Sequence, residues 1–459
     1  MQLSISNQGK AAPRASGRKL LLRKIFYLPT VAWLLLWASI NTGPWEIRHL
    51  FSGGMGVVNG LRAVGPVVIF ILGLFLLLAR NKETPATAMT WPEKFFCLYG
   101  FAMLLSSIQV SPWFDAAYWA FAFIATLLVV RSFLGGSALL ANIVWLNILT
   151  WAITSIVLVV LLFVAREALF GAETGYGVVN RVGDLSIGPM SRSTGLARFA
   201  SIPAIIAFVL LWRMQSVWQW VLTASVFLIS IWLVWFMQSR GAIFSLAFAL
   251  GFVMLFKGRW PRVMGIFLVV ISILVGAGGI VSQDTINYIW DHITRGTGAE
   301  GFRDMSGRDL IWQHAWEAIK EQPIIGYGPQ ADRRIIFANA QNGVIYAMLC
   351  AGGMGLIGYV GGMISAWWYF IKIKMRFKLS SFESDFTMMC AGILAFFTLR
   401  SYPENAAALF SIDLLVQYPV MVFFPVMYKH LLLRTKVRYI GCAHPSISQN
   451  HGAPVLYST

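Results

Sequence analysis

The sequence has few charged residues, few acids and only four cysteines. Charged residues make up 12% of its 459 residues, whereas about a quarter of the residues in soluble domains are charged. Hydrophobic residues make up 58%, and the mean hydropathy is +0.69. This composition excludes an ordinary soluble domain. The cysteines show no CxxC spacing and lie in or near apolar runs or in the C-terminal tail, so we expect neither a disulfide framework nor a zinc site.

Long apolar runs are present instead, each close to the roughly 20 residues that cross the hydrocarbon of a bilayer. They predict an all-α polytopic membrane protein with about twelve transmembrane helices. The expected spans are 25–41, 63–79, 95–111, 116–131, 138–165, 197–212, 217–237, 241–256, 263–282, 343–371, 386–402 and 407–428. The first span follows a basic leader without an A-x-A-like cleavage site, so we expect it to be a retained anchor.

The distribution of basic residues predicts the orientation of these spans. If residues 1–24 and 429–459 are cytoplasmic, the cytoplasmic segments hold 22 Lys and Arg against 4 Asp and Glu, and the remainder holds 14 against 15. This bias follows the positive-inside rule and explains the net charge of +17 without nucleic acid as a partner. Helices 1–9 then occupy 25–282 with an outward loop at 166–196, a large outward loop occupies 283–342, and helices 10–12 occupy 343–428.

Lysine is scarce on the outward side, where arginine recurs at membrane boundaries. Lys320 is the only outward lysine, whereas five arginines lie at or near span ends: Arg192, Arg198, Arg240, Arg308 and Arg400. Snorkelling explains any one of them, but either residue type can snorkel. The planar guanidinium fork matches phosphate oxygens and keeps its charge in a low-dielectric site. Several guanidinium groups at one membrane interface therefore indicate a diphosphate ligand.

The stretch "SGRDLIWQHAWEAIKEQPIIGYGPQ", residues 306–330, predicts an amphipathic helix in the large loop. Ser306 and Asp309 form a potential capping box, and Pro323 ends the helix. The pattern predicts a buried stripe of Ile311, Trp312, Ala315, Trp316 and Ile319. The positive helix N-terminus, where Arg308 projects, favours phosphate binding. A purely structural interfacial helix is the alternative.

Four motifs carry a family resemblance. The loop stretch above is followed by "FANAQNGVIYAMLCAGGMGLIGYV", and upstream lie "SRSTGLARFAS" and "QSRGAIFSLAFAL". Their order from Arg192 to Gly362 resembles the O-antigen ligase and O-antigen/exopolysaccharide polymerase superfamily. The glycines of the apolar span are expected to serve close helix packing rather than phosphate binding.

The resemblance implies a metal-independent glycosyltransferase of the bacterial inner membrane, without a cofactor, acting at the periplasmic face with both termini in the cytoplasm. Its donor would be an undecaprenyl-diphosphate-linked oligosaccharide. The acceptor would be the next lipid-linked repeat unit in a polymerase, or lipid A-core in a ligase. Membrane lipids and a chain-length regulator are further expected partners. Arg240 and Arg308 would grip the donor diphosphate, with Arg192 as an accessory; Arg198 and Arg400 are further candidates.

One position departs from the family pattern. Ligases of the family have a histidine in A-H-N, where this sequence has Gln341 followed by Asn342. Glutamine does not take up a proton near neutral pH, so it cannot be a general base. The departure favours a polymerase over a ligase, with Gln341 and Asn342 as substrate-binding residues. Glu404 is the candidate base, and an ion pair with Arg400 is the alternative for it.

Two other classes compete with this interpretation. A transporter or flippase typically shows two similar halves and ionisable groups near the bilayer midplane. The sequence shows no obvious repeat, and its outward charges gather at the membrane boundary. A peptidoglycan-polymerising glycosyltransferase is disfavoured because no acidic catalytic pair is evident in the loops.

Overall fold

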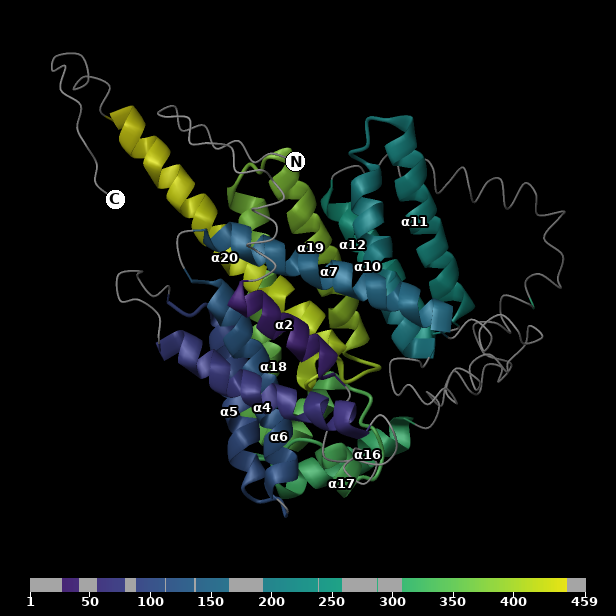
Figure 1. The fold of residues 1–459 in the computed structure, drawn as a ribbon, viewed down its shortest axis with the longest axis vertical. Helices are drawn as coiled ribbons and strands as arrows, with labels where there is room; N and C mark the ends of the chain where they lie inside the picture. The colour runs from purple at the N-terminus through teal and green to yellow at the C-terminus, as the bar shows by residue number, and fades with distance from the viewer. Residues whose placement is uncertain are drawn as a thin grey trace.

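The computed structural model (Figure 1) describes residues 27–40, 56–78, 88–111, 113–135, 138–164, 193–237, 239–257, 287 and 308–443. In this part of the chain, every regular element is helical. The helices of the first half are α2 (Leu28–Ala38), α4 (Gly56–Leu78), α5 (Trp91–Ser107), α6 (Trp113–Phe133), α7 (Leu139–Val164), α10 (Ser193–Leu211), α11 (Val217–Phe236) and α12 (Arg240–Phe256). Those of the second half are α16 (Arg308–Glu321), α17 (Ala331–Ile335), α18 (Gly343–Arg376), α19 (Ser381–Arg400), the 3-10 turn η4 (Ala406–Ala408) and α20 (Ile412–Ala443).

A multi-pass membrane protein is confirmed in general, but the number of spans stays a prediction. Each predicted span except 263–282, which lies outside the described residues, overlaps a helix, although the last one, 407–428, begins before α20. Among the described residues, seven helices are long and apolar enough to cross a bilayer: α6, α7, α10, α11, α18, α19 and α20. The apolar helices α2 and α12 are shorter. At 1.5 Å per residue, α2 extends only about 16 Å, roughly half of the hydrocarbon thickness.

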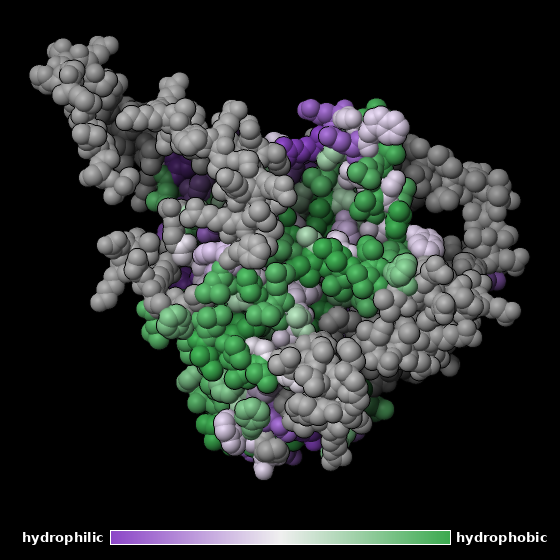
Figure 2. Space-filling view, viewed as in Figure 1, coloured by the Kyte–Doolittle hydropathy of each residue, from purple (hydrophilic) through white to green (hydrophobic). Residues whose placement is uncertain are grey.

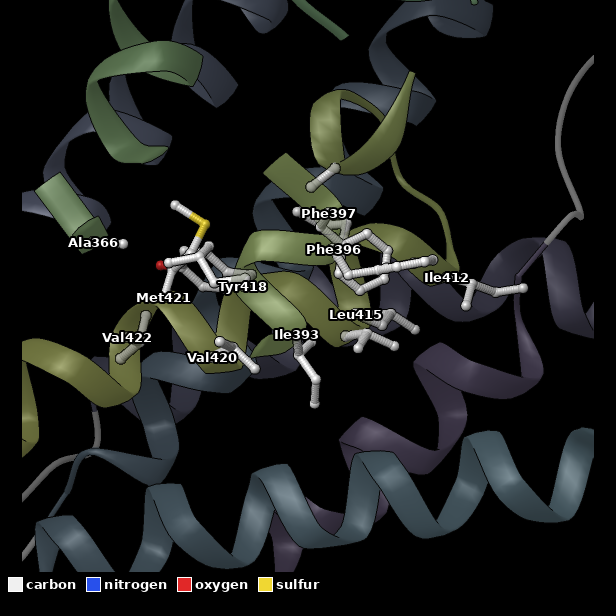
Figure 3. Packing of buried hydrophobic residues seen from close by; sticks show 14 of the residues in the cluster. Ala366, Ile393, Phe396, Phe397, Ile412, Leu415, Tyr418, Val420, Met421 and Val422 are labelled. Atoms are coloured by element: carbon white, nitrogen blue, oxygen red, sulfur yellow. The ribbon is translucent and has the colours of Figure 1, made fainter. Parts of the chain in front are cut away.

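The core lies where α20 passes between α19 and α18 (Figure 3). Tyr418 and Met421 of α20 and Phe396 of α19 are almost completely buried there. By contrast, α11 lies at the periphery (Figure 1) and exposes most of its apolar side chains. Figure 2 shows apolar surface across the middle of the molecule and hydrophilic patches towards its upper and lower ends. This distribution fits a helix bundle that is surrounded by lipid at mid-height.

Small residues let α18 approach α5 closely. A Cβ added to Gly358 would lie 2.7 Å from the Cβ of Tyr99, and one added to Gly362 would lie 2.4 Å from the ring of Phe96. Real Cβ atoms do not come this close, so these positions require glycine. The prediction that the glycines of this span serve helix packing is therefore confirmed for Gly358 and Gly362.

The prediction is wrong for Gly352, where α18 is interrupted. Gly352 has φ 58° and ψ −149°, and the loop segment Pro323–Gly328 inserts against the interruption. A Cβ on Gly352 would lie 2.3 Å from the backbone of Ile324. Three backbone hydrogen bonds join the two segments: Tyr327 N–H to Leu349 O (2.9 Å), Gly328 N–H to Cys350 O (2.8 Å) and Gly353 N–H to Pro323 O (2.7 Å). The loop thus satisfies backbone groups that the broken helix leaves unpaired.

The amphipathic helix α16 is confirmed, with one error in its predicted buried stripe. Ala315 and Ile319 are buried, but Trp316 is 47% exposed. Ala318, which was not predicted, is buried instead, because the contact face follows the 315, 318, 319 spacing of a helix. Trp312 is half-buried and its Nε1–H donates to the carbonyl of Ala340 at 2.8 Å. The predicted capping residue at 306 lies outside the described residues.

Candidate functional site

The turn at 401–405, which follows α19, is the point where the sequence motifs meet. The backbone N–H of Gly343 donates to the carbonyl of Ser401 at 2.7 Å. The next contact is made by Asn342, whose N–H donates to Oδ1 of Asn405 at 3.1 Å. These two bonds fix the N-terminus of α18 against the C-terminus of α19.

Helices α12 and α16 reach the same turn from other sides. A Cβ on Gly241 would lie 3.3 Å from Cγ of Pro403, so the glycine of the S-R-G motif allows the start of α12 to approach the turn. The rings of Trp312 and Tyr402 meet edge to face with centroids 5.2 Å apart. The residues that begin α12 and α16, Arg240 and Arg308, are therefore brought to one place although they are far apart in the sequence.

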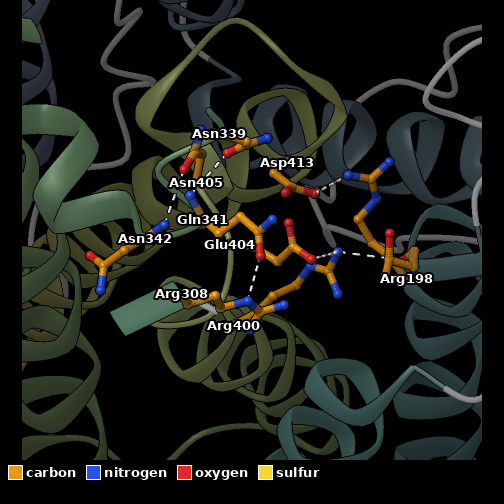
Figure 4. A network of polar contacts seen from close by, with 10 residues as sticks. Arg198, Arg308, Asn339, Gln341, Asn342, Arg400, Glu404, Asn405 and Asp413 are labelled. Atoms are coloured by element: carbon orange, nitrogen blue, oxygen red, sulfur yellow. Dashed lines mark hydrogen bonds and ion pairs between the residues drawn. The ribbon is translucent and has the colours of Figure 1, made fainter. Parts of the chain in front are cut away.

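Arg308 is hydrogen-bonded to Gln341, the position that departs from the family motif (Figure 4). Nε of Arg308 donates to Oε1 of Gln341. Gln341 has φ 47°, and its N–H donates to Oδ1 of Asn339 at 2.9 Å. Within the described residues, Arg308 forms no ion pair with a carboxylate and stays partly exposed. Gln341 thus orients Arg308 without neutralising its charge.

Arg240 lies close enough to Arg308 for the two positive charges to repel each other. Both side chains are partly exposed. Bringing two guanidinium groups together costs Coulomb energy, most of all where water is partly excluded. An anion that contacts both groups would offset this cost, and their planar forks suit the oxygens of a phosphate.

Arg400, at the end of α19, adjoins the same turn and is only 2% exposed. Its Nη2 lies 4.0 Å from Oε1 of Glu404 and donates to the carbonyl of Thr194 at 3.4 Å. Its Nε and Nη1 are buried and form no hydrogen bond with any described residue. Glu404 is 25% exposed at its side chain. The predicted Arg–Glu pair is therefore present, but it is long and leaves two buried donors unused.

Arg198 forms a tighter ion pair. Its Nη1 lies 2.8 Å from Oδ1 of Asp413, with side-chain exposures of 11% and 7%. This pair joins α10 to α20 next to Arg400 (Figure 4). Asn342 also has an internal partner, because its Oδ1 accepts from the first N–H groups of α18. The substrate contacts predicted for Arg198 and Asn342 stay predictions, and the observed bonds give both residues a structural role.

Two supporting residues, Asp332 and Asn405, were missed from the sequence. Asp332 is buried and accepts from the N–H of Ala340 at 3.2 Å and from that of Arg333 at 2.9 Å. Its side chain also interacts with Asn405. Burial raises the pKa of the Asp332 carboxyl above its usual range, and these hydrogen bonds oppose the shift. In the sequence, an aspartate beside two arginines looks like part of a solvated surface.

The remaining predicted residues cannot all be placed. Arg192 lies outside the described residues, as does most of the loop at 166–196. Five of the predicted residues lie around the turn at 401–405: Arg240, Arg308, Gln341, Arg400 and Glu404. In the part of the chain that the structure describes, no three potential metal-ligating side chains cluster.

Residues 225–360 match the family described as O-Antigen ligase. The matched segment runs from α11 into α18 and includes Arg240, Arg308 and Gln341. No curated protein matches the chain. Members of the family are membrane glycosyltransferase-like enzymes that act on lipid-linked glycans and glycan acceptors. The match over residues 225–360 supports membership of the chain in the O-antigen ligase/polymerase superfamily.

Proposed function

We propose that this protein is a polysaccharide polymerase that joins undecaprenyl-diphosphate-linked repeat units at the periplasmic face of the bacterial inner membrane, in exopolysaccharide or O-antigen biosynthesis. The observation that carries the proposal is the convergence of Arg240, Arg308 and Arg400 on one turn. Arg240 and Arg308 are partly exposed, and Arg400 is buried with two donors that form no hydrogen bond with any described residue. A concentration of guanidinium groups at the end of a helix bundle suits a membrane-anchored diphosphate.

The donor diphosphate would lie between Arg240 and Arg308. A diphosphate offers oxygens on two phosphorus atoms, so each fork can bind one phosphate in bidentate fashion. The N-terminus of α16 adds the partial positive charge of a 14-residue helix close to Arg308. Gln341 holds the Arg308 side chain in one direction, which reduces the entropy that binding would otherwise cost.

In the transfer step, the bond between the anomeric carbon of the donor glycan and the diphosphate oxygen breaks. The bonding electrons leave with the diphosphate, whose growing charge Arg240 and Arg308 stabilise. The hydroxyl oxygen of the acceptor repeat unit forms the new bond to the anomeric carbon, and its proton passes to Glu404. Because a diphosphate is already a good leaving group, stabilising the departing charge matters more than activating the acceptor. No metal or cofactor takes part in this proposal.

Gln341 supports a polymerase over an O-antigen ligase. Its carboxamide oxygen is occupied by Arg308, and a carboxamide takes up no proton near neutral pH. The acceptor side must then rely on another group, and Glu404 is the partly exposed carboxylate of the turn. The alternative, transfer of the glycan to lipid A-core, uses the same donor chemistry and differs only in the acceptor.

The choice of acceptor can be tested with purified protein in bilayers. Lipid-linked repeat units alone should give a ladder of longer lipid-linked products, detected by electrophoresis or mass spectrometry. The substitution Arg308→Ala should abolish the ladder. The control substitution Arg333→Ala, at an exposed arginine of α17, should leave the ladder unchanged. A product that forms only when lipid A-core is added would show that the protein is a ligase and not a polymerase.

A transporter of lipid-linked oligosaccharides is the alternative from another class. The family comparison gives it no support. The bilayer assay also separates this class, because a transporter would move the labelled lipid across the membrane and leave its glycan length unchanged.

A further inference from the structure

A second polar site lies at the opposite ends of the helices that build the arginine site. The C-terminal ends of α10, α12 and α18 and the first turn of α19 enclose a cleft of about 240 Å³. Three basic residues line it: Arg213, Lys257 and Lys374. The cleft is smaller than the pockets of roughly 300–1,000 Å³ that hold drug-sized ligands, which fits a headgroup and not a whole glycan.

The cations of this cleft outnumber its carboxylate. Asp385 is the acid that lines the cleft, and its Oδ1 lies 3.1 Å from Nζ of Lys257. Its Oδ2 lies 3.8 Å from Nη1 of Arg213. Lys257 also donates to the carbonyl of Val209 at 2.8 Å. Three cations against one carboxylate leave the cleft with a net charge of +2.

Among the described residues, Lys374 is the cation of the cleft that has no carboxylate partner. It is half-buried and, in the part of the chain that the structure describes, forms no ion pair or hydrogen bond. Burying an ammonium group without an anionic partner costs free energy, so the site is poised for an anion. The charge bias of the sequence predicts that this end is cytoplasmic, where the leaflet carries acidic lipids.

The rest of the lining suits a phosphate that is attached to a lipid. Ser381 and Ser384 offer hydroxyl donors, and the N-terminus of α19 adds partial positive charge. Trp212 and Phe256 supply the apolar part of the wall, and tryptophan is enriched at membrane–water interfaces. A lysine-centred cleft with aromatic walls therefore combines a phosphate subsite with contact for a lipid backbone.

We propose that this cleft binds a phosphate group, with the headgroup of an acidic phospholipid as its preferred source. Binding would join the ends of α10, α12, α18 and α19, the helices whose other ends carry the arginine site. The proposal does not depend on the proposed enzyme activity. It also differs from that site in chemistry, because its central cation, Lys374, is a lysine that acts as a point charge and tolerates different phosphate geometries.

The test uses the full chain in nanodiscs, with phosphatidylglycerol titrated into phosphatidylcholine, and native mass spectrometry to count retained lipids. Lys374→Gln should weaken retention of phosphatidylglycerol about 10- to 100-fold, as expected for a hydrogen bond to a charged group. The matched control is Lys378→Gln, an exposed lysine outside the cleft, which should leave retention unchanged. Because Lys374 forms no ion pair or hydrogen bond with the described residues, its loss should not unfold the chain. Ser384→Ala, a second variant, should weaken retention by a smaller factor.

Inorganic phosphate distinguishes the two sources of the ligand. If millimolar phosphate raises the Tm in detergent, displaces phosphatidylglycerol and needs Lys374, the cleft is a site for free phosphate. If phosphate has no effect and phosphatidylglycerol binds in a Lys374-dependent way, the ligand is the lipid headgroup. Equal retention in Lys374→Gln and Lys378→Gln, with no effect of phosphate on either, would overturn the proposal.

Discussion

The two ends of helices α10, α12, α18 and α19 both gather positive charge, but with different residues. At one end, the described residues of the site include four arginines: Arg198, Arg240, Arg308 and Arg400. The other end centres on two lysines, Lys257 and Lys374, with Arg213 at its edge. The carboxylates differ as well, since each buried arginine of the first end has its own acid, whereas Asp385 serves two cations at the second.

This difference indicates what each end must hold. A planar fork in a fixed direction selects the geometry of its ligand, and the Gln341 contact fixes that direction for Arg308. A lysine is a flexible point charge and selects mainly for negative charge. The arginine end thus suits a diphosphate ligand of one geometry. The lysine end suits phosphate groups that are attached to different molecules.

The largest expected effect comes from breaking the buried pair at the arginine end. Asp413→Asn leaves the Arg198 guanidinium buried without a counter-charge. Loss of one partner of a buried pair costs about 3–5 kcal/mol of unfolding free energy. Thermal or denaturant unfolding in detergent measures the loss, with Asp309→Asn on the exposed face of α16 as the control. A change below about 1 kcal/mol, the value typical of surface pairs, would mean that this pair does not hold α10 to α20.

Glu404→Gln tests the acceptor side of the same end. It removes the proposed base but keeps the shape of the side chain, and general-base help is worth roughly 10²- to 10⁴-fold. We expect kcat to fall by about 10²-fold, the low end of that range, because the leaving group is good. The protein should stay folded, since the Arg400 contact is long at 4.0 Å. Unchanged turnover in a purified assay would assign the acceptor proton to another group.

Gln341→Ala should have a smaller effect, because Gln341 orients Arg308 and does not itself carry charge. Loss of one orienting hydrogen bond costs about 0.5–1.5 kcal/mol, which is roughly a two- to tenfold loss of activity. The informative quantity is the ratio of the activity loss in Glu404→Gln to the activity loss in Gln341→Ala. An indispensable Gln341 beside a silent Glu404 would reverse the assignment of the two residues.

The smallest effect on turnover is expected at the opposite end. Lys374→Gln should leave the activity within about twofold of the parent at saturating donor, since the cleft lies at the far ends of the helices. Polymer formation in bilayers of fixed lipid composition measures this. A loss as large as that of an arginine variant would mean that the two ends are not separate sites.

The general layout could be predicted from the sequence, because apolar length and charge bias act locally. The position of α16 and the convergence of Arg240 and Arg308 follow from the motifs and their placement at helix ends. The insertion of Pro323–Gly328 at the break in α18 could not be predicted. It depends on reciprocal backbone contacts between distant segments, and the glycine of that break, Gly352, resembles its neighbours in a packing stripe.

Buried polar contacts also could not be predicted from local sequence patterns. Asp413 lies near the start of the predicted span 407–428, and in the structure it is a buried partner of Arg198 from another helix. Trp316 follows the apolar stripe of α16, but the face that meets the bundle is set by Ala315 and Ile319. Such contacts depend on which helix faces which, and residue spacing within one helix carries no information on that.

The affinity for a diphosphate-linked carrier, compared with that for its monophosphate counterpart, tests the central claim most directly. The parent protein should bind undecaprenyl diphosphate at least about tenfold more tightly than undecaprenyl phosphate, because two forks engage two phosphates. Arg308→Ala and Arg308→Lys should each lose this preference, and Arg333→Ala should keep it. If Arg308→Ala retained the full preference for the diphosphate, Arg308 would not hold the donor and the account of this site would be wrong.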